Sequence, residues 1–477
     1  MVRKPRKRIC LPSRFHGPWG VPLLPLLFLS CLLLWPAVGR SAAPWDLEKL
    51  INRALEANWD MISAQENVQK AGLNLQSAEA AFELKIYPGA SFGLSGGDGT
   101  STDTNLGMAV SLEKKMSFGT TIGVEPSVIR EEGDYRNRTN IRIVQPLLRG
   151  VGSDYTMSGV YSARFSERAA IRSRYQREVL TVIGAVTNGY NVIRQRETLR
   201  LREESFQRLK KMEEATAIKE RMGLVTPMDL YRVRIQLNQA EEELISSQES
   251  YVDALDSIKI FLAMPLNEEV DVSLPLTFDR IYPKEQEMIQ TALANRVELD
   301  QVHDELAEAR RLSDRSKKDI LPDLDIGLSV NFDGDPSARF PGSSPDQTTW
   351  GLSLGSTTDL MRTSEKAIYE GSLIDVQQSS RRQIIVRDNV VAEVKRELRN
   401  LERQDKAITN QEDQINQARG QLELARIKFQ HGMTDNFDLI DAEISLRRSE
   451  TRLVSAVIDY IVGQYRLRQA IGTLIQR

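Results

Sequence analysis

The side chains best placed for chemistry are carboxylates beside two short turns. The segment Thr226-Pro227-Met228-Asp229 has a hydroxyl able to cap a helix, a proline suited to the first helical position and an acid three residues after the threonine. Asp435-Asn436-Phe437-Asp438 repeats this pattern. Because the amino end of a helix carries partial positive charge, Asp229 and Asp438 are expected first of all to stabilise helix starts.

The residues that common enzyme mechanisms need are scarce. Cys10 and Cys31 both precede residue 40, and His303 and His431 are the only histidines after it. This excludes cysteine nucleophiles and Cys/His zinc sites from the rest of the chain, and leaves little for histidine acid–base catalysis. The acidic run Glu241-Glu242-Glu243 is expected to be solvated charge on exposed helical faces. We expect no enzyme activity, no metal and no cofactor.

The first 40 residues have the pattern of a secretory signal peptide. A basic stretch precedes an apolar run from Val21 to Trp35, and Ala37-Val38-Gly39 offers small residues for cleavage. A membrane anchor is the alternative, but the run is short and broken by prolines. A lipoprotein site at Cys31 is disfavoured because apolar residues continue past it. Cleavage leaves 57 basic and 66 acidic residues, a net charge near −9 that argues against a nucleic-acid partner.

The elements that position the two turns occur twice in the chain. Gly223, Asp229, Leu230, Leu237, Leu244 and Tyr251 recur 209 positions later as Gly432, Asp438, Leu439, Leu446, Leu453 and Tyr460. A unit of about 200 residues is far longer than a solenoid repeat. We predict repeat 1 over residues 41–264, a linker over 265–283 with three prolines, and repeat 2 over 284–477. Each repeat has a helix, a β insert (88–150 or 322–358) and a long helical hairpin.

The helical stretches are unusually long. Residues 157–222 are nearly free of helix breakers, and at 1.5 Å per residue they would extend roughly 100 Å. Apolar and small residues recur in steps of three and four after each turn, from Leu230 to Phe261 and from Leu439 to Leu474. This heptad pattern predicts helices that supercoil along one another, with solvated Glu, Arg, Gln and Lys on the outer face.

The two inserts alternate between apolar and polar or small residues. Leu324, Ile326, Leu328, Val330 and Phe332 are separated by Asp325, Gly327, Ser329 and Asn331, and four further segments alternate likewise. Such strands with Gly- and Asp-rich turns are typical of an outer-membrane β-barrel. The alternative is a soluble half-buried hairpin, which alternates in the same way.

Taken together, these features resemble the TolC-like outer-membrane efflux protein family. The resemblance covers about Trp45 to Arg477. Its carriers, none specific alone, are Ala54-Leu55 with Asn58, their repeat Ala292-Leu293 with Asn295, Leu321-Pro322, the segment Gln145 to Gly150, and the turns Met222 to Thr226 and His431 to Asp435. The resemblance implies homotrimers in which each chain gives two hairpins to a shared outer-membrane barrel. The long helices would form a periplasmic α-barrel that engages a periplasmic adaptor protein and an inner-membrane transporter.

One departure from the family concerns the first insert, which has room for four strands where the second has room for two. Either the barrel is wider than usual or the extra hairpin lies outside the membrane band. A cluster of charges between Arg130 and Arg138 favours the second interpretation.

The resemblance also implies roles for residues at the turns. Asp438 and Asp441 would point into the closed pore at its periplasmic tip, with Asp229 at the first turn. Where the family archetype has an arginine and a tyrosine that bond to the first turn, this chain has Thr434 and Phe429. We therefore expect Phe429, Phe437 and coiled-coil packing to hold the closed state. The tip turns and the adaptor contact would comprise Gly223, Thr226, Gly432, Thr434, Phe429 and Phe437.

The sequence favours an exit duct of a tripartite efflux or type I secretion system, passing small molecules or polypeptides. The alternative is a periplasmic coiled-coil adaptor or structural tether without a pore. An adaptor should have a lipoyl-like or flattened-barrel domain and one hairpin, whereas this chain repeats helix, insert and helix. A secreted hydrolase lacks a plausible set of catalytic residues.

Overall fold

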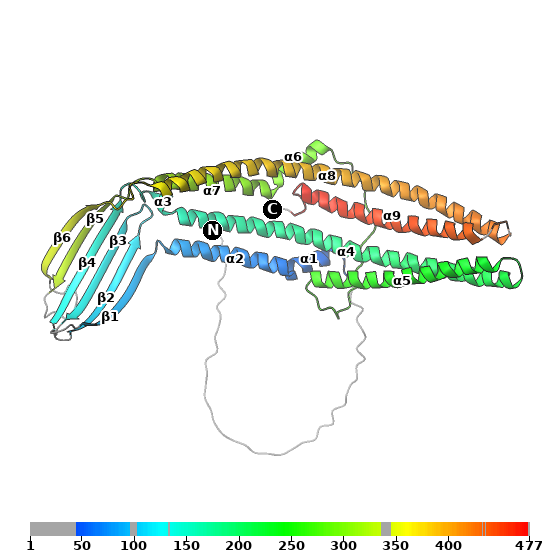
Figure 1. Cartoon of the computed structure of the whole chain (residues 1–477), viewed down its shortest axis with the longest axis horizontal. Coiled ribbons are helices and arrows are strands. Elements are labelled where there is room, and N and C mark those ends of the chain that lie inside the picture. Colours follow the sequence, from blue (N-terminus) through cyan, green and yellow to red (C-terminus); the bar gives the residue numbers. More distant parts are fainter. Residues whose placement is uncertain are drawn as a thin grey trace, which may run out of the picture. The chain divides into compact units, whose positions relative to one another are not determined.

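The computed structural model describes residues 44–95, 103–131, 134–334, 345–431, 433–434 and 436–475. The predicted signal peptide lies outside them. Within this part of the chain, helical segments alternate along the sequence with two groups of strands that form one antiparallel sheet (Figure 1).

The helical segment that opens each repeat is divided in two. In repeat 1 it forms α1 (Leu47–Ala57) and α2 (Trp59–Ala80), and in repeat 2 it forms α6 (Glu285–Asn295) and α7 (Val297–Asp319). Asn58 causes the first break: its backbone is extended and its side chain accepts a hydrogen bond from the Asp60 amide at 2.9 Å. The amide group of Asn58 also donates to the carbonyl of Phe261 at 2.8 Å, which fixes the break against the end of the first helical hairpin.

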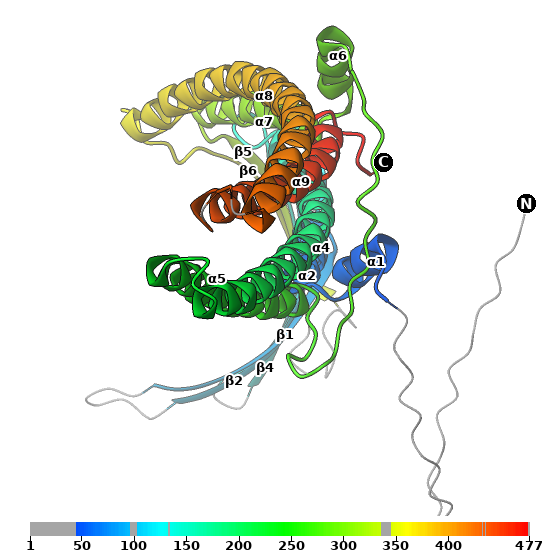
Figure 2. The same ribbon diagram turned by 90° about the vertical axis from the view of Figure 1, so that its right-hand side faces the viewer.

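The long helical hairpins are present in both repeats. They are α4 (Ser158–Arg221) with α5 (Pro227–Phe261), and α8 (Thr363–Gln430) with α9 (Asn436–Ala470). A short helix, α3 (Ser153–Thr156), precedes α4. The two members of each hairpin pack along each other, and α9 also packs on α4, so the hairpins lie side by side (Figure 2). Because such long helices bury too little surface alone, this lateral packing is what stabilises them. None of the helices in the described residues is long and apolar enough to cross a bilayer.

The linker between the repeats is irregular but well packed. Trp45 forms a parallel bridge with Val272, with hydrogen bonds of 2.8 and 3.0 Å to the carbonyl of Asp271 and from the amide of Ser273. Val272 and Leu274 belong to a buried cluster with residues of α1, α4, α5 and α9. The linker therefore contributes to the helical core.

In the described residues, six strands form one antiparallel sheet in the order β1 to β6 (Figure 1). They are β1 (Leu84–Ser95), β2 (Asp103–Lys115), β3 (Thr121–Glu131), β4 (Asp134–Pro146), β5 (Asp325–Gly334) and β6 (Pro345–Gly355). The first insert begins four residues earlier than predicted, at Leu84 in place of 88. All four of its strands are paired within this sheet, and β4 pairs with β5 of the second insert.

The sheet joins the helices through backbone contacts and one buried arginine. The amide of Leu147 donates to the carbonyl of Leu324 at 2.8 Å, which extends the β4–β5 pairing toward the helices. Arg362 precedes α8 with a left-handed backbone (φ 55°), and its guanidinium donates to the carbonyls of Ile320 and Leu321 at 2.8 and 2.6 Å. Arg362 thus satisfies carbonyls that the end of α7 leaves without helical partners.

Candidate functional site

The two predicted turns connect the long helices of each hairpin. In the first, α4 ends at Arg221 and Gly223 takes a left-handed backbone (φ 75°), which glycine adopts without steric cost. In the second, α8 ends at Gln430 and α9 begins at Asn436. Gly432, predicted to be a tip residue, lies outside the described residues. The turns stand at corresponding ends of neighbouring hairpins (Figure 1).

Asp229 stabilises the first turn. The backbone amide and the hydroxyl of Thr226 donate to its carboxylate at 3.0 and 2.7 Å, and the Thr226 hydroxyl accepts from the Asp229 amide at 3.3 Å. This is a capping box, and the residue is only 9% exposed. The geometry therefore favours the capping role for Asp229 over a place among pore-lining acids.

Asp438 and Asp441 are both exposed in the first turns of α9. The hydroxyl of Thr434 donates to the carboxylate of Asp438 at 2.5 Å. Thr434 thus orients one of the two acids. A spacing of three residues places the two carboxylates on the same side of the helix, free of the packed seam.

The two phenylalanines predicted at the tip differ in environment. Phe429 is buried with Ala425, Leu439 and Ala442, where α8 and α9 meet. Lys219, near the end of α4, donates to the carbonyl of Phe429 at 2.9 Å, and its ammonium lies 3.9 Å from the ring centroid. A cation thus links the two hairpins by a hydrogen bond and a cation–π contact. The expectation that Phe429, Phe437 and coiled-coil packing hold the closed state stays a prediction, and this contact adds a charged partner for Phe429.

Phe437 is 59% exposed, and other apolar side chains at the turns are exposed with it. They are Met222, Leu224, Met228 and Met433. Exposed apolar side chains gathered at the ends of helices mark a surface suited to a partner.

Buried polar contacts join α9 to the first hairpin next to the turns. Asn436 is fully buried, and its side-chain amide donates to the hydroxyl of Thr216 at 3.3 Å and to the carbonyl of Asp229 at 3.4 Å. Two turns further along α9, the carboxylate of Glu443 accepts from Arg208 Nε at 2.5 Å and from Ser205 Oγ at 3.4 Å. The Glu443 side chain is only 4% exposed.

A further contact joins three helices. Glu243 of α5 pairs with both Arg202 of α4 and Arg447 of α9. Burial lowers the pKa of Arg202 below the ordinary value of an arginine. The expectation that the run Glu241-Glu242-Glu243 is solvated was wrong for Glu243. Its side chain is only 28% exposed, because its position on α5 directs it toward α4 and α9.

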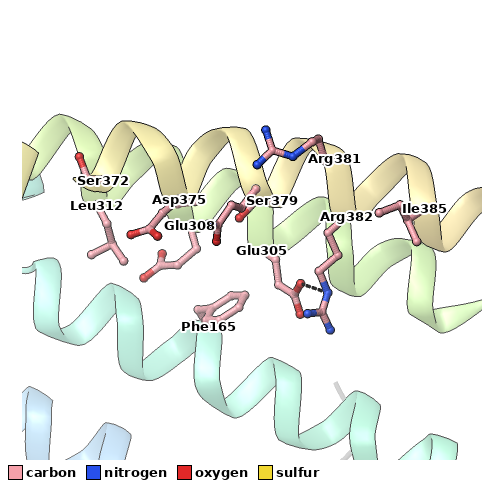
Figure 3. Close-up of a pocket in the computed structure, with 12 residues that line it drawn as sticks. Phe165, Glu305, Glu308, Leu312, Ser372, Asp375, Ser379, Arg381, Arg382 and Ile385 are labelled. Carbon is pink, nitrogen blue, oxygen red and sulfur yellow. Dashed lines mark ion pairs between the residues drawn. The ribbon is translucent and has the colours of Figure 1, made fainter. Parts of the chain in front are cut away.

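A pocket of about 610 Å³ lies between α4, α7 and α8, away from the turns (Figure 3). Phe165 comes from α4, while Glu305 and Glu308 come from α7, and Arg382 of α8 pairs with Glu305 at 3.4 Å. Burial disfavours the charge of Glu308, but hydrogen bonds from Arg311 and Ser162 outweigh it, and its pKa is lowered overall. No cluster of His, Cys, Asp and Glu within the described residues could hold a metal ion.

The sequence identified the turns but missed the contacts between them. Thr226 and Asp229 form the local bonds that the capping pattern predicts, whereas Asp435, the predicted capping residue of the second turn, lies outside the described residues. Lys219, Glu243 and Glu443 were not predicted, because each meets a residue about 40 to 240 positions away. Closeness to the apolar seam gave no signal for Glu443, because Asp441 also lies one position from Ala442 and is exposed.

Comparison with known proteins identifies the fold. Residues 288–473 match the family model described as outer membrane efflux protein. The Campylobacter jejuni CmeC outer membrane channel is similar with a TM-score of 0.72 and 12% identity, over 90% of this chain and 86% of that one. The open state of the Neisseria gonorrhoeae MtrE outer membrane channel is similar with a TM-score of 0.68 and 16% identity, over 90% of this chain and 89% of that one.

The outer membrane protein VceC from Vibrio cholerae is also similar, with a TM-score of 0.70 and 13% identity over 89% of this chain and 96% of that one. At these identities the similarity establishes the fold. No curated protein sequence matches the chain. The family model and the solved structures together confirm the resemblance to the TolC-like outer-membrane efflux proteins.

Proposed function

We propose that this protein is an outer-membrane channel, the exit duct of a tripartite efflux or type I secretion system. It would pass small molecules or polypeptides across the periplasm and the outer membrane. The observation that carries this proposal is the sheet with one apolar face, joined to duplicated long helical hairpins that match the outer membrane efflux fold. A bilayer accepts such a sheet only when all its backbone groups are paired.

The open edges of the sheet support assembly into a homotrimer. β1 and β6 are the outermost strands in the described sheet, so one side of each lacks a neighbour within the chain. Pairing β1 of one copy with β6 of the next would close the wall and remove both edges. The helices would then stand in the periplasm, where the exposed apolar turns would contact a periplasmic adaptor and, through it, an inner-membrane transporter.

The gate would be formed by Asp438 and Asp441. Three copies of each exposed carboxylate in a narrow neck would bind cations and repel anions. Asp229 would support the gate indirectly, because its capping box holds the first turn and its backbone carbonyl accepts from Asn436 of α9.

The competing proposal, an adaptor or tether without a pore, is disfavoured by the sheet. Phe92, Met108, Trp350 and Leu352 are 62% to 76% exposed on one face, and a soluble domain would have to cover them.

The test is conductance in planar lipid bilayers. Asp438→Ala and Asp441→Ala should raise conductance and abolish block by multivalent cations, whereas Glu242→Ala, at an exposed acid of α5, should leave both unchanged. In cells, deleting the gene should raise sensitivity to exported compounds or abolish secretion of a polypeptide. A purified protein that inserts into bilayers without forming any pore would refute the proposal.

A further inference from the structure

The first insert supplies twice as many strands as the second. β1 to β4 have 12, 13, 11 and 13 residues, and β5 and β6 have 10 and 11. A tilted strand needs about 9–11 residues to cross a bilayer. All six strands are therefore long enough to cross.

The apolar face of the sheet continues through all six strands. Cross-strand pairing places six apolar side chains in one row, namely Ile86, Leu112, Val124, Ile141, Val330 and Trp350. The neighbouring row, on the opposite face, consists of Lys85, Glu113, Gly123, Arg142, Ser329 and Gly351. A hairpin that stood in water would have no reason to keep its apolar side chains in register with the rest of the sheet.

The charges between Arg130 and Arg138, which favoured a hairpin outside the membrane, lie at the β3–β4 connection or on the polar face of the sheet. Arg130 and Glu131 end β3 and Asp134 begins β4, beside the connection between them. Arg136 and Arg138 alternate with the apolar-face positions of β4, and Arg138 pairs with Asp333 of β5 at 2.7 Å. The charged cluster is thus compatible with strands that cross the membrane.

We propose that all six strands of each copy are wall strands in contact with lipid acyl chains. This rests on the proposed function, because it assumes a shared trimeric barrel. Three copies then form a wall of eighteen strands, whereas exclusion of one hairpin per copy would leave twelve. Because barrel diameter grows roughly linearly with strand number, the barrel is about 1.5 times wider, in the range that leaves an aqueous channel.

Single cysteines can test which strands face lipid, since both native cysteines lie in the predicted signal peptide. Met108 pairs directly with Val128 on the apolar face, and Ala109 with Ser127 on the polar face. In proteoliposomes, fluorophores at Met108→Cys and Val128→Cys should be quenched by spin-labelled lipid. Ala109→Cys and Ser127→Cys should react with a water-soluble maleimide and escape that quenching.

Leu352→Cys and Ser353→Cys on β6 are the matched controls. Suppose that Leu352→Cys faces lipid and Ser353→Cys faces water, while all four cysteines on β2 and β3 react with the water-soluble maleimide. The six-strand wall is then refuted, and the proposed channel function is not. If the controls do not alternate either, the sheet does not face lipid and the proposed function fails.

A distance measurement tests the strand number. With strands about 4.8 Å apart and tilted about 40°, eighteen strands give a diameter of about 36 Å and twelve about 24 Å. Equivalent backbone positions in a trimer would then be about 31 or 21 Å apart. Pulsed electron paramagnetic resonance between nitroxides on Leu352→Cys should give the larger of these two separations. The smaller separation would overturn the proposal.

Discussion

Glu443 provides the most direct test of how the two helical hairpins are held together. Its buried carboxylate accepts from Arg208, whose own side chain is 36% exposed. A hydrogen bond between charged groups contributes roughly 1.5–3 kcal/mol. Because Arg208 can regain water when its partner is removed, little desolvation cost remains on it. We expect Glu443→Ala to lower the free energy of unfolding by about 2 kcal/mol, within that range.

The same contact should bias the gate proposed at the turns. If it is present in the closed state and lost when α9 moves away from α4, its removal shifts the equilibrium toward opening. At 1.4 kcal/mol per factor of ten, a loss of about 2 kcal/mol raises the open-to-closed ratio about 30-fold. Glu443→Ala should therefore raise the open probability of single channels in planar bilayers.

A double-mutant cycle with Arg208→Ala separates this contact from general destabilisation. Urea unfolding followed by helical circular dichroism should give a coupling energy of about 1–2 kcal/mol. Glu241→Ala, at an exposed acid of α5, is the matched control and should change neither stability nor opening. A coupling energy below about 0.3 kcal/mol, the usual limit of additivity, would refute the reasoning.

Three further predictions follow from the described residues. Gly223→Ala should cost about 1–2 kcal/mol in urea unfolding from backbone strain alone, since nothing lies within 4 Å of the added methyl group. Lys219→Met should lower the unfolding midpoint by removing the bond to Phe429, and Lys219→Arg should restore part of it. Burial raises the pKa of Tyr190 to about 12, above the value near 10 expected when unfolded. Between pH 10 and 12 the unfolded state therefore releases this proton first, and stability falls with pH; Tyr190→Phe should flatten that fall in urea titrations.

The architecture was predictable where it depends on local pattern. The near absence of helix breakers predicted a helix over 157–222, and α4 spans Ser158–Arg221. Alternation predicted the strands, and capping residues predicted the bonds of Thr226 and Asp229. Each of these features depends on residues only a few positions apart, so a short stretch of sequence is enough to predict it.

The contacts between hairpins were not predictable in the same way. Glu242 is exposed and Glu243 joins three helices, although they are adjacent acids. Their difference depends on how α5 rotates against α4 and α9, which no short pattern specifies. The contact of Lys219 could not be predicted for the same reason, because its partner is the backbone carbonyl of Phe429, 210 positions away.

The unequal inserts have a simple topological reason. Each insert leaves the helices and returns to them, since β1 follows α2 and β4 precedes α3, while β5 follows α7 and β6 precedes α8. In an antiparallel sheet this return requires an even number of strands, so an insert can grow only by whole hairpins. Such growth leaves the helices after the insert unchanged. This explains why the residues at and after the two turns match at a constant offset of 209 positions although the inserts differ in length. In the proposed trimer one added hairpin per copy becomes three, so the width of the wall can change in large steps without altering the contacts at the proposed gate. Substitutions at Glu443 and at the positions of β2 and β3 proposed to face lipid should accordingly have independent effects.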